Sequence, residues 1–214
     1  MTLAEPYELS LRELVYEPGV PVTHVHFPLT AVISLITVSD GRGVEVATVG
    51  KEGMAGLPVF LGGLSMPARA IAQVPGGSIR LTARGLDEAV AGDDSLRNIL
   101  GKYTQALLTQ ISQSAACNRL HDVEARCARW LLMTDDRVEG SEFIITHEFL
   151  AQMLGVRRAS VSNAAGVLQK RGLIRYSRGR VIVTNRKGLE AVACACYDIT
   201  RNEYDRLLSP ALSA

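Results

Sequence analysis

Residues 146–161 read Thr-His-Glu-Phe-Leu-Ala-Gln-Met-Leu-Gly-Val-Arg-Arg-Ala-Ser-Val, and this stretch decides the fold of the C-terminal third of the chain. Thr146 is a good N-cap for a helix over residues 147–154. Gly155 then permits a tight turn, where a residue with positive φ is often needed. A second helix is expected over residues 157–171. Two short helices that cross at a glycine turn are typical of a helix-turn-helix.

A β-hairpin is predicted directly after these two helices. Gly172 lies where a C-terminal glycine cap belongs. Residues 173–176 and residues 181–184 are mainly apolar or β-branched, and a basic turn, Ser-Arg-Gly-Arg, separates them at residues 177–180. Two such runs around a short glycine-containing turn indicate a hairpin. We interpret this hairpin as the wing of a winged helix-turn-helix.

Charge is distributed unevenly along the chain, although the net formal charge is only +1. Residues 1–91 carry 6 Lys or Arg and 9 Asp or Glu, whereas residues 122–190 carry 12 and 8. Within residues 157–187 there are nine basic residues and no acidic residue. A basic stretch of this kind is either a solvated face or a surface that contacts phosphates. Its coincidence with the helix pair and the wing favours a DNA-binding surface.

Side chains near the N-terminal end of the second helix are expected to enter the major groove. There Arg158 can pair with guanine and Asn163 with adenine. Basic residues farther along, Arg171 among them, are expected to hold phosphates, which adds affinity without sequence information. The predicted DNA-binding residues are Arg157, Arg158, Ser160, Ser162, Asn163, Lys170, Arg175, Arg178 and Arg180.

The first 90 residues have short β-rich runs, such as residues 31–38 and 43–49, separated by glycine and proline turns. This spacing predicts a small β-barrel or jelly roll, and no helical period of useful length is evident there. From Asp93 the pattern becomes helical to about Leu120, with an apolar stripe that includes Leu100 and Leu107. The stripe faces either the β domain or a partner helix, and a coiled-coil-like dimer seam is the functional interpretation.

The predicted fold class is therefore α+β, with an N-terminal β jelly roll, a long dimerisation helix and a C-terminal winged helix-turn-helix. The expected boundaries are residues 1–91 for a β-barrel sensor domain and 92–121 for the dimerisation helix. The DNA-binding domain is expected over residues 122–192, followed by a C-terminal helical tail over 193–214.

These features resemble the Crp/Fnr family, the group of the cyclic-AMP receptor protein and the fumarate-nitrate regulator. Residues 146–161 resemble its helix-turn-helix, and Asp-Val-Glu-Ala-Arg at 122–126 resembles the hinge after its dimer helix. Residues 49–56 and 67–70 fall where its sensor domain has the nucleotide cassette. The resemblance implies a homodimer that regulates transcription on a palindromic operator, with Arg158 as the main guanine reader and RNA polymerase as a further candidate partner.

The sensor departs from the family pattern for cyclic nucleotides. That cassette uses Gly-Glu for the ribose and Arg-Ser or Arg-Thr for the phosphate, but Leu57 follows Gly56 here and Ala70 follows Arg69. A buried phosphate without its hydrogen-bond partners is poorly compensated. We therefore expect an effector other than cyclic AMP, without identifying it. The effector pocket carried over from the resemblance comprises Gly56, Leu57, Arg69, Ala70, Ile111 and Ser112.

No metal ligand and no cofactor is predicted. An iron–sulfur cluster needs about four thiolates, and the N-terminal domain has no cysteine. If residues 194–196 are helical, Cys194 and Cys196 point about 200° apart and cannot bind one metal together, so we interpret them as packing residues. His24 and His26 share a face of a strand, as cupin metal ligands do, but no carboxylate follows them. His121 beside the hinge is ambiguous.

The favoured function is a sequence-specific transcription regulator and not an enzyme. Two alternatives stay open: a cupin-like metalloenzyme fused to a helix-turn-helix, and a sensor for a non-nucleotide small molecule or a protein. The chain shows no signal peptide and no apolar run of membrane-spanning length, which predicts a cytoplasmic protein without membrane contact. Whether it activates or represses transcription does not follow from the residues.

Overall fold

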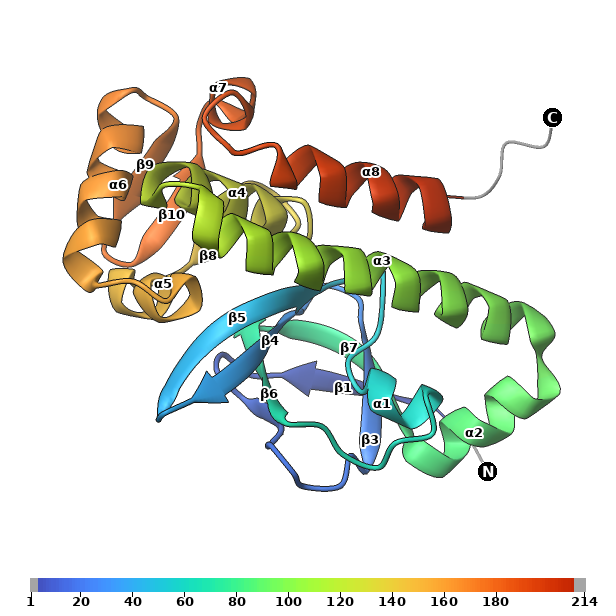
Figure 1. Cartoon of the computed structure of the whole chain (residues 1–214). Helices are drawn as coiled ribbons and strands as arrows, with labels where there is room; N and C mark the ends of the chain where they lie inside the picture. Colours follow the sequence, from blue (N-terminus) through green and yellow to red (C-terminus); the bar gives the residue numbers. More distant parts are fainter. Residues whose placement is uncertain (1–3, 210–214) are drawn as a thin grey trace, which may run out of the picture.

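A β-sandwich forms the N-terminal part of the molecule in the computed structural model, which describes residues 4–209 (Figure 1). One antiparallel sheet has the order β1-β7-β3 and the other the order β2-β6-β4-β5. Apolar side chains of both sheets form a shared core, as expected for strands that alternate between an inner and an outer face. The strands are β1 (Ala4–Leu9), β2 (Leu14–Tyr16), β3 (His24–Pro28), β4 (Val32–Ser39), β5 (Arg42–Val49), β6 (Ala68–Val74) and β7 (Gly76–Thr82).

Two helices interrupt or follow the sandwich, in a part of the chain where no helical period of useful length is evident from the sequence. The short helix α1 (Leu57–Phe60) lies between β5 and β6, and α2 (Ala83–Gly92) follows β7. The Thr82 hydroxyl caps α2 by accepting a hydrogen bond from the Gly85 backbone N–H. Only Gly85 and Leu86 of α2 are buried. Ala83 and Val90 of α2 are partly buried and pack against the core of the sandwich.

Helix α3 (Asp94–Leu120) is the long helix that the sequence predicts, and the Asp93 side chain caps its first turn. Its apolar stripe, with Leu100 and Leu107 only 4% and 3% exposed, packs into the core of the β-sandwich of the same chain. The stripe is therefore not the face left for a partner. Helix α8 (Cys196–Leu208) lies along a second side of α3 (Figure 1). Among residues 4–209 no helix, α3 included, is both long and apolar enough to cross a membrane.

The C-terminal domain confirms the predicted winged helix-turn-helix and adds a third strand to the wing. Its small sheet has the order β8-β10-β9. Strand β8, which precedes the helix pair in the chain, pairs with β10 at one edge of the wing hairpin. Side chains from these helices and strands form one buried cluster. The elements are α4 (Val123–Asp135), β8 (Glu142–Ile144), α5 (His147–Leu154), α6 (Arg158–Lys170), β9 (Ile174–Ser177), β10 (Arg180–Val183) and α7 (Arg186–Glu190).

Polar contacts connect the β-sandwich to helix α4 of the C-terminal domain. The indole N–H of Trp130 donates to Glu45 Oε1 at 2.8 Å, and the Gln73 amide donates to Thr134 Oγ1 at 2.8 Å. Burial raises the pKa of Glu45, and the hydrogen bonds from Ser34, Thr48 and Trp130 oppose that effect. Satisfied buried hydrogen bonds fix relative orientation, because breaking one leaves a buried polar group without a partner. These hydrogen bonds therefore stabilise the contact between the two domains.

Candidate nucleic-acid interface

Local sequence signals fix the geometry between α5 and α6. The Thr146 hydroxyl accepts a hydrogen bond from the Phe149 backbone N–H at 3.1 Å, as its N-cap position predicts. Gly155 has φ +64°, and a Cβ atom at this position would lie 2.9 Å from Cγ2 of Val44 on β5. Gly155 is therefore required both by the turn and by the close approach of the β-sandwich.

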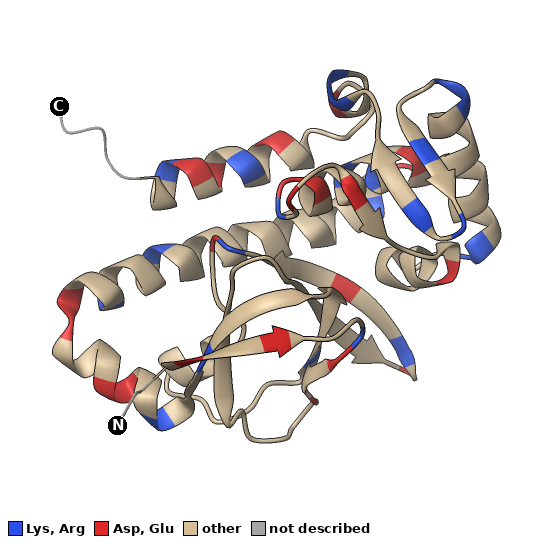
Figure 2. Cartoon of the chain, turned by 180° about the vertical axis from the view of Figure 1, so that it is seen from behind, with Lys and Arg blue, Asp and Glu red and all other residues tan. Residues whose placement is uncertain are grey.

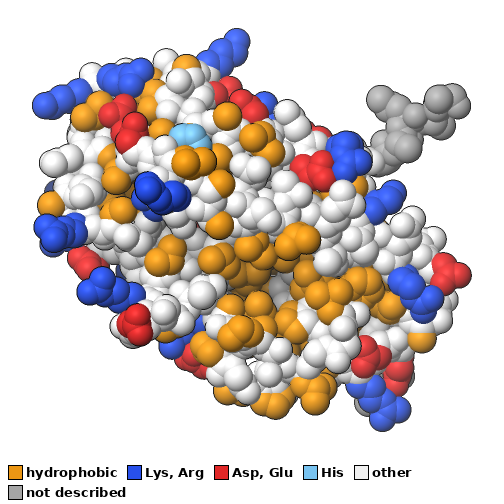
Figure 3. Space-filling model, in the orientation of Figure 1, with side chains coloured by type: hydrophobic (Ala, Val, Ile, Leu, Met, Phe, Trp, Pro, Cys, Tyr) orange, Lys and Arg blue, Asp and Glu red, His pale blue; other side chains and the backbone are white. Residues whose placement is uncertain are grey.

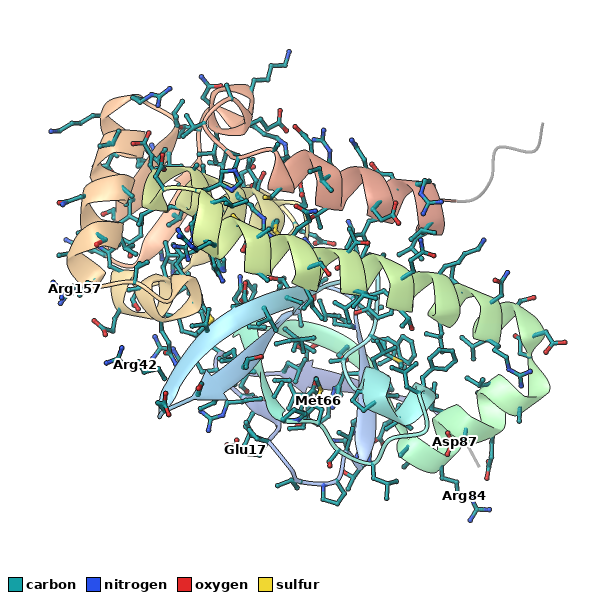
Figure 4. All side chains as sticks on the ribbon, viewed as in Figure 1. Glu17, Arg42, Met66, Arg84, Asp87 and Arg157 are labelled. Carbon is teal, nitrogen blue, oxygen red and sulfur yellow. The ribbon has the colours of Figure 1, made fainter. Side chains whose placement is uncertain are left out.

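The first two turns of α6 present an exposed polar face. Val161 is fully buried and anchors the helix, whereas Arg157, Arg158 and Asn163 are exposed. The labelled Arg157 lies at the N-terminal end of α6, at the outer edge of the molecule (Figure 4). The nearest carboxylate to Arg158 is that of Glu148, at 4.0 Å between two exposed side chains. Such a pair contributes little, so the guanidinium is available to a ligand.

The two serines of the predicted site are partly buried, and one of them is engaged within the domain. Ser162 Oγ lies 2.9 Å from His147 Nδ1, and the His147 ring stacks against Tyr176 with centroids 4.3 Å apart. Burial and the nearby Arg158 charge lower the pKa of His147. His147 and Tyr176, which the sequence pattern did not single out, thus support the exposed face of α6 from behind.

The wing turn confirms the predicted short hairpin. Ser177 pairs with Arg180, and the two residues between them, Arg178 and Gly179, have φ +49° and +77°. Positive φ at both central positions defines a type I′ turn, whose twist suits a two-residue hairpin. The Arg178 side chain is thereby displayed at the tip of the wing.

Three arginines of the wing line one surface hollow. The hollow has a volume of about 290 Å³ and is bordered by Arg175, Arg178 and Arg180. Glu142 also borders it and pairs with Arg180 at 2.9 Å, which leaves an excess of positive charge. Lys170 is exposed at the last turn of α6. Lys and Arg residues occur along α6, the wing and α7 (Figure 2), a distribution suited to a polyanion.

A second site, an apolar cavity of about 350 Å³, lies between α3 and the β-sandwich. Three of the six predicted effector-pocket residues line it, namely Gly56, Leu57 and Ile111. The other lining residues were not predicted, because only the folded chain brings them together; they are Tyr16, Leu35, Met54, Pro58, Leu61, Met66, Thr104, Leu107 and Leu108.

Arg69, Ala70 and Ser112, the other three predicted pocket residues, do not line the cavity. The Arg69 guanidinium pairs with Glu17 on the rim of the sandwich at 3.0 Å. Ala70 is fully buried within β6, and Ser112 is exposed on α3. No basic side chain among the described residues faces the cavity. Its lining therefore provides no cation to compensate a phosphate.

The histidines of β3 do not form a metal site within the described part of the chain. His26 is buried, and its ring lies edge-on to Tyr7 with centroids 5.5 Å apart. Its Nδ1 lies 3.5 Å from Ser78 Oγ, whereas His24 Nδ1 contacts Thr23 Oγ1 at 3.0 Å. No third ligand joins this pair among residues 4–209. The cupin-like alternative is not favoured.

The expectation for Cys194 and Cys196 rested on a helix that covers both residues, and that premise is wrong. Helix α8 begins at Cys196, and Cys194 lies in the preceding turn. The two thiol groups therefore lie on the same side, together with Cys117 and His121 from the end of α3. The 200° separation expected within a helix does not apply.

Comparisons with known proteins agree with this geometry. A family model described as the Crp-like helix-turn-helix domain matches residues 125–192. FixK2 from Bradyrhizobium japonicum is 20% identical with a TM-score of 0.75, and the match covers 90% of this chain and 98% of that one. A Crp/Fnr-family transcriptional regulator from Thermus thermophilus is 21% identical with a TM-score of 0.70, over 88% and 98%.

The c-di-GMP-responsive global regulator CLP from Xanthomonas campestris is 17% identical with a TM-score of 0.65, over 85% of this chain and 94% of that one. No curated protein sequence matches the chain. The helix pair and the wing define a winged helix-turn-helix, a type of domain that binds DNA, and the basic surface suits that role. The family match assigns residues 125–192 to the Crp-like helix-turn-helix domain, and the solved structures show that the whole chain has the fold of the Crp/Fnr regulators.

Proposed function

We propose that the chain regulates transcription as a homodimer on a palindromic operator, with α6 in the major groove and the wing on the flanking backbone. The observation that carries this proposal is the exposed face formed by the start of α6 and the wing, on which basic side chains outnumber acidic ones. Arg158 and Asn163 would read base edges there. The hollow bordered by Arg175, Arg178 and Arg180 would hold a phosphate.

The third face of α3 supports dimerisation, because it is left uncovered by the chain's own domains. Leu108 is 62% exposed on this face, and Gly101, Leu108 and Ala115 recur at seven-residue intervals. Thr104 and Ile111 lie beside them and are half-buried. A seven-residue repeat of small and apolar side chains is typical of a helix–helix seam. We assign the dimer seam to this face and not to the buried stripe of Leu100 and Leu107.

The apolar cavity beside this seam supports an effector without a phosphate. Thr104, Leu108 and Ile111 belong both to the proposed seam and to the cavity wall. Hydrophobic side chains form a band over this face of the molecule (Figure 3). We propose an uncharged, largely apolar small molecule as the effector, since binding it would cost no unpaired buried charge. Such a molecule would touch both protomers and thereby adjust their angle.

Operator selection from random DNA with the purified chain tests the proposal. We expect an enriched palindrome whose half-sites are about one helical turn apart, as two recognition helices related by a two-fold axis require. Sedimentation of the same preparation should give a dimer. Selection that enriches no sequence, or only a single half-site bound by a monomer, would contradict the proposed mode of binding.

Cyclic AMP and long-chain aliphatic compounds are the informative ligands for the cavity. We expect no saturable calorimetric signal with cyclic AMP at micromolar concentration. Saturable binding of cyclic AMP would contradict the proposed apolar effector and leave the DNA-binding proposal intact.

A further inference from the structure

Four potential metal ligands meet at the base of the DNA-binding domain. Cys117 and His121 come from the last turn of α3 and its C-cap, Cys194 precedes α8, and Cys196 is the first residue of α8. The Cys117 and Cys194 sulfur atoms are 3.4 Å apart, and Cys196 Sγ lies 3.7 Å from His121 Nδ1. All four donor atoms lie within 4.8 Å of one another. No other such group occurs in the part of the chain that the structure describes.

The sulfur–sulfur distance of 3.4 Å and the sulfur–nitrogen distance of 3.7 Å are close to those of a tetrahedral zinc site. Zinc–sulfur bonds of about 2.3 Å at the tetrahedral angle place two ligand sulfurs about 3.8 Å apart, and a sulfur and a nitrogen slightly closer. We propose that Cys117, His121, Cys194 and Cys196 form a closed structural Zn²⁺ site. Three thiolates and one imidazole are a known ligand set for structural zinc, and the fourth protein ligand leaves no open position for catalysis.

Two buried arginines beside the cluster support an anionic centre there. Arg126 and Arg129 are 7% and 9% exposed, and in each the Nε atom is buried without a hydrogen-bond partner. Arg126 donates to Asn118 Oδ1 and to the Leu154 carbonyl, and Arg129 donates to Ser114. Neither forms a salt bridge with a carboxylate among residues 4–209. Zn²⁺ with three thiolates and a neutral imidazole carries a net charge of −1, which would partly compensate these cations.

The position of the site indicates what the metal would do. The whole DNA-binding domain lies between His121 and Cys194 in the chain, so one ion would bind the segment that enters the domain to the segment that leaves it. The hinge at Asp122 directly follows a ligand. Metal binding would therefore fix the angle between α3 and the DNA-binding domain, because binding free energy at such a site becomes folding free energy.

Metal analysis of the full chain, purified without chelators, tests the site directly. We expect about one Zn²⁺ per chain. After removal of the metal, Co²⁺ should restore the site with the near-ultraviolet thiolate charge-transfer band and the strong visible d–d bands of tetrahedral coordination. Cys196→Ser should weaken Zn²⁺ binding by at least about 100-fold, more than the loss of a partner outside the ligand shell.

Cys127→Ser is the matched control, because Cys127 is a buried cysteine of α4 outside the cluster. We expect it to retain the metal. Alkylation of the wild-type chain, read by mass spectrometry, covers the case in which Cys196→Ser does not fold. Zn²⁺ should protect Cys117, Cys194 and Cys196, and a chelator should remove the protection.

Three results would overturn the proposal: a chain without metal whose Cys117 and Cys194 form a disulfide, visible absorption from an iron–sulfur cluster, or full zinc content in Cys196→Ser. Zinc content is independent of the proposed operator binding. Loss of operator affinity on metal removal, restored by Zn²⁺, would in addition confirm the role in positioning the domain. Unchanged affinity would refute that role.

Discussion

Replacing Arg158 by alanine should remove a base contact, and replacing Arg178 should remove a phosphate contact. A bidentate contact to guanine discriminates by about 1–3 kcal/mol, and a two-fold dimer loses it in both half-sites, about 2–6 kcal/mol in total. At about 1.4 kcal/mol per tenfold, the lower end already means about 30-fold weaker operator binding. The Arg158 side chain is 69% exposed and has no close ion pair, so its removal should leave folding unaffected.

A salt titration on the selected operator and on random DNA separates the two roles. Arg158→Ala should lower the ratio of specific to non-specific affinity and relax the preference at one base pair in each half-site. Arg178→Ala should weaken binding to all sequences about equally. It should also reduce the slope of log affinity against log salt by about 0.9 per phosphate, or about 1.8 per dimer.

The controls are thermal unfolding of both variants and the same titration on Asn163→Ala. If Arg158→Ala leaves the specificity ratio unchanged while its salt slope falls, Arg158 contacts the DNA phosphates and not a base. The base-reading assignment would then pass to Arg157 or Asn163. Equal losses of specificity in Arg158→Ala and Arg178→Ala would refute the proposal that α6 reads bases and the wing contacts phosphates.

Packing and burial lead to three further predictions. Gly155→Ala should lower the free energy of unfolding, measured by urea denaturation, by about 1–2 kcal/mol, because φ is +64° at this position. Gly166→Ala is the control, since Gly166 lies in the interior of α6 with open space around it. It should leave stability unchanged or raise it by up to about 1 kcal/mol. Leu108→Glu should give folded monomers in sedimentation, and a variant that remains dimeric would move the seam to another face. Burial lowers the pKa of His26 to about 4, below its usual value of 6.5, so the unfolded chain binds the proton more readily. Stability should therefore fall as the pH drops from about 6.5 towards 4; in His26→Gln this fall should be smaller, and an equal fall would show that other groups cause it.

Local chemistry explains why the helix-turn-helix could be predicted almost to the residue. Thr146, Gly155 and Gly172 each act within a few positions of themselves, by capping a helix or by adopting positive φ. The pairing of the edge strand β8 with β10 was less evident, because the residues of a three-residue strand do not specify its partner.

The parts of the site that sequence could not provide depend on contacts between distant segments. The stripe on α3 indicated an apolar face but not whether the β-sandwich, α8 or a partner covers it. Arg69 was assigned to the pocket by resemblance, yet Glu17, 52 positions away, holds its side chain elsewhere. The cysteine cluster joins residues 77 positions apart. The sequence did not predict this cluster, because Cys194 and Cys196 were expected to lie in one helix, whereas α8 begins at Cys196.

Strand β4 lies directly between the apolar cavity and the DNA-binding domain. Successive side chains of a strand point to opposite faces, and β4 uses both faces at once. Leu35 packs in the sandwich core and lines the cavity, whereas its neighbour Ile36 packs in the core of the DNA-binding domain. Ser34, also on the outer face, donates to Glu45, which accepts the Trp130 N–H of α4. A ligand that displaces Leu35 would therefore act on a strand already packed against the DNA-binding domain. Close-packed cores transmit such displacements because they leave few voids to absorb them.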